Sequence, residues 1–200
     1  MVKPYKVKDH YFLEAKAQGY RARSAFKLLD IQEKFDLIKH GQFVLDLGAA
    51  PGSFLQVISK LVGKDGRAFG LDLKEIERFK AQNIKTAVCD ILDEQAVATL
   101  FKLWQLEKVD VITSDLAPNT SGIRDLDQAR SAELVEMAFS VAERLLKSDG
   151  HFVAKVFQGE ELQELLPKLK AKFAKVTLFK PPSCRDRSFE TFIVCKSFRR

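Results

Sequence analysis

The sequence predicts an α/β protein built on a mostly parallel, doubly wound sheet, and three observations support this prediction. Apolar runs of strand length alternate along the chain with segments of helical periodicity. One such run, at 43–47, ends in a glycine-containing loop, and a helix-period segment follows the loop directly. The last two runs are joined by a connection too short for a crossover helix, so they should pair antiparallel.

The elements follow in order from local patterns. The first helix is expected at 24–35, where apolar residues recur at helical spacing, and further helices at about 53–62, 93–104, 126–147 and 160–171. Strands are expected at 42–47, 67–72, 85–89, 108–114, 150–157, 173–180 and 189–196. Alternation of strands and helices implies parallel βαβ units. Seven strands with the last one antiparallel is the topology of the class I S-adenosylmethionine-dependent methyltransferase (Rossmann-like) fold.

Composition fits a single soluble domain. The chain has 200 residues, of which 46% are hydrophobic and 30% charged, and this excludes a disordered chain. No apolar stretch approaches the ~20 residues of a membrane span, and the N-terminus is no secretory signal. The three cysteines form no C-x-x-C pair, and the three histidines are scattered, so no metal site is expected. We expect a cytoplasmic monomer.

Basic residues crowd the N-terminus, although the net charge is only +6. We therefore divide the chain into a basic arm, 1–23, and a methyltransferase domain, 24–200. The arm interleaves aromatic residues with its cations, which are Lys3, Lys6, Lys8, Lys16, Arg21 and Arg23. Composition alone leaves two interpretations open, a solvated tail and a surface that binds RNA phosphates and bases.

The loop after the first strand carries a cofactor signature. Asp46 is followed by glycines at Gly48 and Gly52, with alanines and a proline between them. The loop is no P-loop, because no Gly-Lys-Ser/Thr follows, and it lacks the G-x-G-x-x-G of dinucleotide sites. It resembles the S-adenosylmethionine loop of methyltransferases. Without side chains at Gly48 and Gly52, the backbone can approach a ligand closely.

Two aspartates close the second and third predicted strands. Ligands of open α/β sheets bind beyond the carboxyl ends of the strands. Asp72 would accept hydrogen bonds from two ribose hydroxyls, and Asp90 from an adenine amino group. The alternative for each is a helix N-cap, where Asp is common.

Charged residues also occur in the apolar strands. Asp115 lies at the tip of the fourth strand, and Lys155 lies within the fifth. A buried lysine needs a partner, and Glu190 of the last strand can supply one if that strand runs antiparallel beside the fifth. The alternative is a purely structural Lys–Glu pair.

Four segments together resemble the FtsJ/RrmJ ribose 2′-O-methyltransferases. They are Gly19–Leu28, Asp46–Gly52, Ser114–Asn119 and Lys155–Gly159, and the resemblance extends from about residue 11 to 195. It implies a catalytic tetrad at Lys27, Asp115, Lys155 and Glu190, S-adenosylmethionine as cofactor, no metal, and large-subunit ribosomal RNA or the large ribosomal subunit as partner. The target implied is a uridine 2′-hydroxyl in the peptidyl transferase centre loop.

One departure from the family pattern leaves transfer RNA as an alternative substrate. Ribosomal members typically carry glycine and tryptophan where this chain has Ser53 and Phe54, and Ser53 also resembles the transfer-RNA branch. Phe54 would still supply an aromatic wall for the cofactor. The alternatives are therefore a methyltransferase of the transfer-RNA anticodon loop, a non-catalytic RNA-binding assembly factor, and a small-molecule methyltransferase. The intact tetrad argues against the second, and the basic arm against the third.

Overall fold

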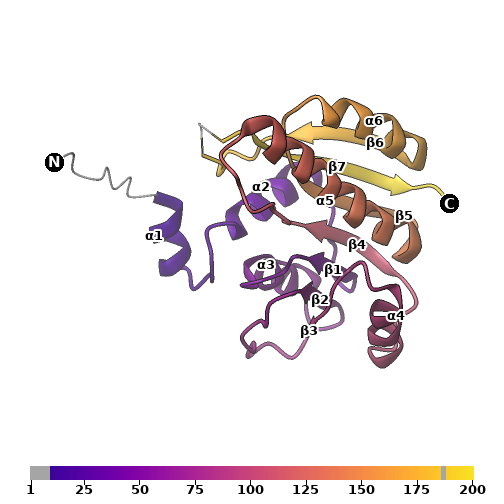
Figure 1. Ribbon diagram of the computed structural model, residues 1–200. Coiled ribbons are helices and arrows are strands. Elements are labelled where there is room, and N and C mark those ends of the chain that lie inside the picture. The colour runs from indigo at the N-terminus through magenta and orange to yellow at the C-terminus, as the bar shows by residue number, and fades with distance from the viewer. Residues whose placement is uncertain (1–9, 186–187) are drawn as a thin grey trace.

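A seven-stranded mixed sheet forms the centre of the computed structural model, which describes residues 10–185 and 188–200. Its strands lie in the order β3-β2-β1-β4-β5-β7-β6, and β7 runs antiparallel to both of its neighbours (Figure 1). This confirms the predicted fold class. The strands are β1 Phe43–Leu47, β2 Arg67–Asp72, β3 Ile84–Val88, β4 Val109–Ser114, β5 Leu146–Phe157, β6 Phe173–Phe179 and β7 Glu190–Phe198.

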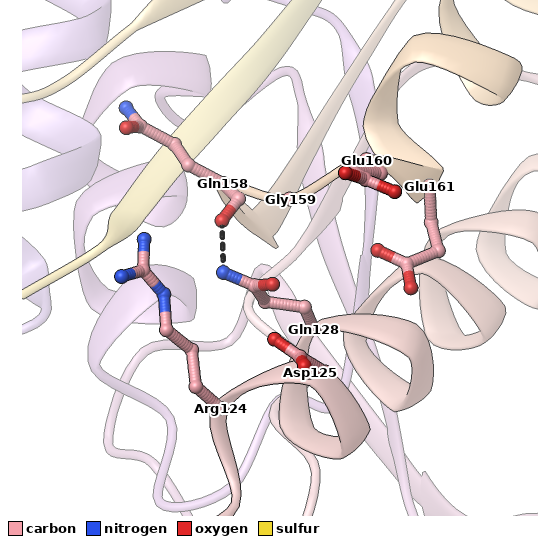
Figure 2. A pocket seen from close by; sticks show the side chains of 7 residues that line it. All are labelled: Arg124, Asp125, Gln128, Gln158, Gly159, Glu160 and Glu161. Carbon is pink, nitrogen blue, oxygen red and sulfur yellow. Dashed lines mark hydrogen bonds between the residues drawn. The ribbon is translucent and has the colours of Figure 1, made fainter.

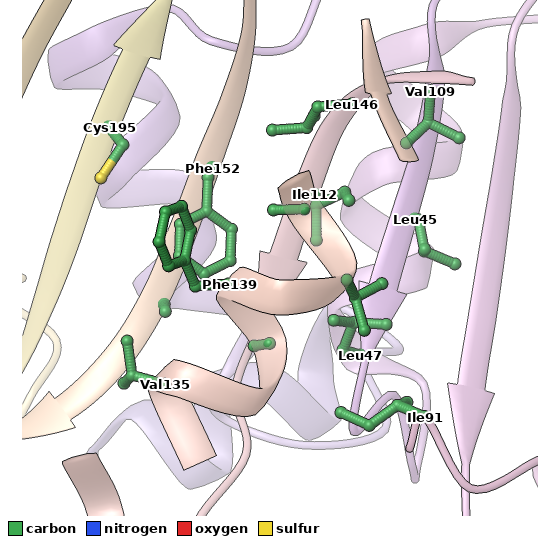
Figure 3. Close-up of a cluster of buried hydrophobic side chains, with 14 of the residues drawn as sticks. Leu45, Leu47, Ile91, Val109, Ile112, Val135, Phe139, Leu146, Phe152 and Cys195 are labelled. Carbon is green, nitrogen blue, oxygen red and sulfur yellow. The ribbon is translucent and has the colours of Figure 1, made fainter. Parts of the chain in front are cut away.

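Helices cover both faces of the sheet and bury two apolar layers. Successive strand residues face opposite layers, so Val44 packs toward one layer and Leu45 toward the other. One layer is closed by α2 (Ala25–Phe35) and α3 (Ser53–Val62). The other is closed by α4 (Glu94–Leu103), α5 (Arg124–Leu145) and α6 (Glu161–Lys172), and in it Phe139 of α5 packs against Phe152 of β5 (Figure 3).

Two elements differ from the prediction. The helix α1 (His10–Ala17) was not predicted, because its aromatic and charged residues form no continuous apolar face. It is attached to the domain through Ala15, which is buried, and through Tyr11, whose ring centroid lies 5.4 Å from that of Phe26. The strand β5 begins at Leu146, inside the segment predicted as helix, because Leu146 is buried and pairs with Val109 of β4.

The carboxyl ends of the parallel strands meet at one edge of the sheet. The loops after β1, β2, β3, β4 and β5 all leave this edge, and the antiparallel β7 begins there, with Glu190 opposite Phe157. The candidate site residues of six strands are therefore brought to one place. No helix within the described ranges is long and apolar enough to cross a membrane.

Candidate active site

Four charged side chains from four elements meet at this edge. Lys155 of β5 donates a hydrogen bond to the backbone carbonyl of Asp115 at 2.7 Å, and its Nζ lies 2.9 Å from Oδ1 of the same residue. Lys27 of α2 lies 2.6 Å from Oε1 of Glu190 and 3.9 Å from Oδ1 of Asp115. The four side chains are between 6% and 19% exposed. The predicted tetrad residues are therefore together in space.

Two members of the tetrad, Lys27 and Glu190, hold each other in their charged states. Burial disfavours the ammonium of Lys27, but the carboxylates of Asp115 and Glu190 outweigh it and raise the pKa of Lys27. Burial likewise opposes ionisation of Glu190, yet Lys27 and then Lys155 lower the pKa of that carboxyl. Lys27 and Glu190 thus form a charged pair at neutral pH, in which each charge compensates the desolvation of the other.

A cysteine adds a further hydrogen bond to Glu190. The Cys184 thiol donates to Oε1 of Glu190 at 3.2 Å. Burial, with the nearby Glu190 carboxylate, raises the pKa of Cys184 to about 12, so the thiol stays protonated and remains a donor. Sequence reasoning did not identify this contact, because Cys184 lies in a loop without periodicity.

A hollow of about 220 Å³ opens beside the tetrad. Its lining includes Arg23, Lys27, Arg185, Ser188 and Glu190. Burial, and then the charge of Arg185, lower the pKa of Arg23, but a guanidinium remains charged at neutral pH. Two guanidinium groups at the mouth of the tetrad can bind a phosphate next to the reacting group.

The two glycines of the first loop take left-handed backbone conformations, with φ of 70° at Gly48 and 104° at Gly52. A Cβ at Gly48 would lie 2.5 Å from Cδ2 of Leu116, and one at Gly52 would lie 2.4 Å from Cζ of Phe79. The protein's own side chains therefore pack closely on both glycines, and a larger residue at either position would displace them.

Arg21 holds this loop in place. Its guanidinium donates to the carbonyls of Pro51 and Arg78 at 2.9 and 3.0 Å and stacks 3.7 Å from the Phe79 ring centroid. It thereby ties the loop after β1 to the segment that follows β2. Arg21 was expected to contact RNA phosphate, but in the structure its guanidinium binds the protein backbone.

The aspartates at the carboxyl ends of β2 and β3 are not helix caps. The carboxylate of Asp72 accepts from the backbone N–H of Ala50 and of Lys74, both at 2.8 Å, and thus ties the first loop to β2. Asp90 is exposed and accepts from the N–H of Leu92, while Asp93 caps the following helix. The structure thus leaves the N-cap alternative without support for either residue.

The carboxylates at the strand tips fit the predicted S-adenosylmethionine. Each oxygen of Asp72 has accepted one backbone hydrogen bond and keeps capacity for a second, as a ribose diol requires. Asp90 faces solvent at the next strand tip, where it can accept from an amino group. Residues 10–185 and 188–200 contain no group of three His, Cys, Asp or Glu side chains placed to hold a metal ion.

Ser53 and Phe54, the departure noted in the sequence, both serve packing. The Ser53 hydroxyl lies 2.7 Å from that of Ser24, so it joins the start of α3 to the start of α2. The Phe54 ring is 3% exposed and packs among the apolar residues beneath α2 and α3, because this position of α3 faces the core. The aromatic ring that lies against the loop is that of Phe79.

Asp46 is a buried acid that the site assignment did not include. It is 1% exposed and accepts a hydrogen bond from the Thr113 hydroxyl at 2.6 Å. Burial raises the pKa of Asp46 well above its ordinary value, and the nearby carboxylates of Asp115 and Asp72 add to this. The signal that could have identified it is an acid within an otherwise apolar strand.

Comparison with known proteins finds similar sequences over nearly the whole chain. Residues 20–198 match the family described as FtsJ-like methyltransferase. A protein of Anaeromyxobacter sp. (strain Fw109-5), named ribosomal RNA large subunit methyltransferase E, is 44% identical over 200 residues, which cover 100% of this chain and 72% of that protein. A protein of the same name from Bdellovibrio bacteriovorus is 45% identical over 190 residues, covering 95% of this chain and 96% of the other.

Solved structures show the same fold. A structure described as a ribosomal RNA methyltransferase from Plasmodium falciparum superposes with a TM-score of 0.78 at 28% identity, covering 90% of this chain and 98% of that one. Fibrillarin from Aeropyrum pernix, solved with natively bound S-adenosyl-L-methionine, superposes with a TM-score of 0.60 at 19% identity, covering 86% and 76%. Because the identity to fibrillarin is only 19%, that similarity shows the fold alone.

Proposed function

The chain belongs to the FtsJ-like methyltransferase family, and from this premise we propose that it methylates a ribose 2′-hydroxyl of large-subunit ribosomal RNA. The proposed target is a uridine in the peptidyl transferase centre loop, reached on the assembled or assembling large subunit. The observation that carries the proposal is the charged cluster of Lys27, Asp115, Lys155 and Glu190 at the sheet edge. We propose further that the enzyme is a cytoplasmic monomer.

Lys155 is the residue best placed to act on the hydroxyl. Its Nζ lies 2.7 Å from the carbonyl oxygen of Asp115 and 2.9 Å from Oδ1 of the same residue, and these two contacts hold the amino group at the edge of the sheet. If its amino group is neutral, Lys155 would take the proton of the 2′-hydroxyl as a general base while the oxygen bonds to the methyl group. If it is an ammonium, it would stabilise the negative charge that develops on the 2′-oxygen, and the proton would leave to solvent. Asp115 orients Lys155 through the 2.9 Å ion pair, and the Lys27–Glu190 pair completes the wall that holds the ribose.

The cofactor, S-adenosylmethionine, supplies the methyl group from a sulfonium centre, which is already a good leaving group. Asp72 would hold the two ribose hydroxyls of the cofactor, Asp90 its adenine amino group, and Asp115 would lie beside the methyl group. Gly48 and Gly52 shape the loop that faces it, and Arg21 keeps that loop in position.

RNA binding is supported by the charges around the tetrad. Arg23 and Arg185 line the hollow beside Lys27 and Glu190, where a phosphate next to the target ribose would bind. The Ser53 hydroxyl is hydrogen-bonded to that of Ser24, so in this structure Ser53 packs α3 against α2.

The test offers the purified protein two substrates, large ribosomal subunits that lack the modification and free transfer RNA. Positions of 2′-O-methylation are then mapped by protection from alkaline hydrolysis. We expect a single mark on a uridine of the large-subunit RNA and none on transfer RNA. Efficient marking of a transfer-RNA anticodon loop, with ribosomal RNA unmarked, would contradict the proposed substrate, and absence of any transfer would contradict the activity.

A further inference from the structure

An exposed ring lies one residue before the catalytic Glu190. The Phe189 side chain is 43% exposed, although large apolar side chains are usually buried. Its ring packs edge-on against that of Phe157, with centroids 6.1 Å apart, and the Arg124 guanidinium lies 5.3 Å from its centroid. We call Phe157, Phe189 and Arg124 the aromatic platform.

The platform is fixed to the catalytic edge by the backbone. The N–H of Gln158 donates to the carbonyl of Phe189 at 2.9 Å, directly beyond the pairing of Phe157 with Glu190. Phe157 follows Lys155 by two residues in β5, so both side chains lie on the same face of the sheet. A group resting on the platform is therefore adjacent to the tetrad.

The loop that precedes Arg124 is also held in place. The carboxylate of Asp127 accepts from the backbone N–H and the hydroxyl of Ser121, at 2.7 and 2.9 Å, and from the N–H of Gly122 at 3.2 Å. These bonds hold the loop that leads from Asp115 into α5, where Arg124 is the first residue. The platform thus joins the first residue of α5 to the last residue of β5 and to the residue before β7.

A cavity of about 600 Å³ adjoins the platform. Figure 2 shows Arg124 and the Gln158 side chain along one side of it and two acidic side chains, Glu160 and Glu161, on the other. The Gln128 amide closes its floor by donating to the Gln158 carbonyl. A Cβ at Gly159 would lie 2.9 Å from the Gln128 side chain, so this floor is tightly packed.

The chemistry of the cavity selects one part of an RNA chain. Carboxylates in its lining repel phosphates but accept hydrogen bonds from the N–H groups of bases. Exposed rings and guanidinium planes stack on bases that are splayed out of single-stranded RNA. The ligand that fits both features is a nucleobase with N–H donors on its edge, stacked on the platform.

Building on the proposed function, we propose that the platform binds the base of a nucleotide at or next to the target ribose, with the base edge directed into the adjoining cavity. Stacking on the platform would hold this base apart from the other bases of the RNA and would place the target sugar next to Lys155. Phe189 and Arg124 are thus positioning residues for the RNA, distinct from the tetrad that acts on the hydroxyl.

The test uses Phe189→Ala and Phe189→Trp, with Leu178→Ala as a matched control, since Leu178 is 42% exposed on β6. The first readout is the fluorescence of a short single-stranded RNA that contains one 2-aminopurine, whose emission is quenched when it stacks. The second is KM for large ribosomal subunits. We expect Phe189→Ala to lose the quenching and raise KM about tenfold or more, and the other two variants to resemble the wild type.

Arg124→Lys separates stacking from charge, because lysine keeps the cation but not the planar group. It should reduce the quenching while leaving the salt dependence of RNA binding unchanged. Absence of quenching in the wild type, or equal quenching and KM in Phe189→Ala, overturns the proposal. The quenching assay needs no methyl transfer, so failure of the wild type to modify ribosomal subunits would count against the proposed function alone.

Discussion

At the scale of single residues, Lys155 and Asp46 illustrate two ways of burying an ionisable side chain. Lys155 is 7% exposed, and both the carbonyl and the carboxylate of Asp115 are close to its amino group. Asp46 is buried with a neutral hydroxyl as its hydrogen-bond partner, so its carboxyl resists ionisation. The first arrangement places two oxygen acceptors beside a buried amino group, whereas the second disfavours a charge on a buried carboxyl.

The first prediction concerns Lys155→Ala. It should reduce methyl transfer by roughly a hundredfold to a thousandfold or more, because a buried donor to the reacting oxygen is lost. Its affinity for S-adenosylmethionine, measured by calorimetry, should stay within a fewfold of wild type, because the proposed cofactor contacts come from the first four strands. Lys147→Ala, at the opposite end of β5, is the control and should keep activity. A Lys155→Ala protein that cannot bind cofactor would contradict the assigned role.

The second prediction concerns Asp46→Asn. The raised pKa means that the unfolded chain ionises Asp46 more readily than the folded protein does, so the contribution of Asp46 to wild-type stability falls as pH rises above about 4. Asparagine cannot ionise. The unfolding free energy of the variant minus that of wild type should therefore increase between pH 4 and 7, by about 1.4 kcal/mol for each unit by which the pKa is raised.

Urea titrations at several pH values measure this difference. The exposed Asp149→Asn is the control, and its difference from wild type should not change with pH in the same way. A constant difference for Asp46→Asn would show that the buried carboxyl has an ordinary pKa in the folded protein.

At the scale of elements, the segment before α2 and the segment after β2 together enclose the first loop. Arg21, in the segment before α2, donates hydrogen bonds to the carbonyl of Pro51 in the loop and to that of Arg78 after β2. The Phe79 ring lies against Gly52. The loop is thus held from outside by residues distant in sequence, in addition to its own glycine conformations.

The third prediction follows from this clamp. Arg21→Ala removes two hydrogen bonds and a cation–π contact, a loss of about 1–2 kcal/mol of loop ordering, which corresponds to roughly five- to thirtyfold weaker binding of S-adenosylmethionine. Calorimetry measures the change, and Arg67→Ala, an exposed arginine of β2, serves as the control. If cofactor affinity is unchanged while RNA binding weakens, the arginine contacts RNA instead.

The sequence predicted the helices and strands well where apolar residues recur at regular spacing. The antiparallel β7 followed from a connection that is too short for a helix, and this placed Glu190 beside the strand of Lys155. The contacts of Arg21, Phe79 and Cys184 were not predicted, because they lie in long irregular segments whose path depends on tertiary packing. Phe54 was assigned to the cofactor since sequence alone does not tell which face of α3 is buried.

At the scale of the whole molecule, the net charge of +6 is unevenly distributed along the chain. The arm holds Lys3, Lys6 and Lys8, which lie outside the described residues, so the proposed role of this part in RNA binding rests on its composition. The part of the arm that the structure describes, residues 10–23, includes α1, and α1 packs against α2.

The fourth prediction concerns this charge. If each of the three lysines neutralises one phosphate, replacing all three with alanine should flatten the slope of log affinity against log salt by about 2 units. Titrations of RNA binding between low and moderate salt measure the slope. Replacement of three lysines of α6, at 168, 170 and 172, is the control, and it should leave the slope close to wild type. An unchanged slope in the arm variant would mean that the arm is merely solvated.

The position of β7 has a consequence for the timing of synthesis. It lies between β5 and β6, although it follows both in the chain. Until it has left the ribosomal exit tunnel, β5 has an unpaired edge, β6 has no neighbour in the sheet, and Lys27 lacks the carboxylate that pairs with it. A nascent chain in which β5 and β6 have formed therefore still lacks one of the four charged residues of the candidate site. The proposed catalytic centre is thus completed only when β7 has joined the sheet between β5 and β6.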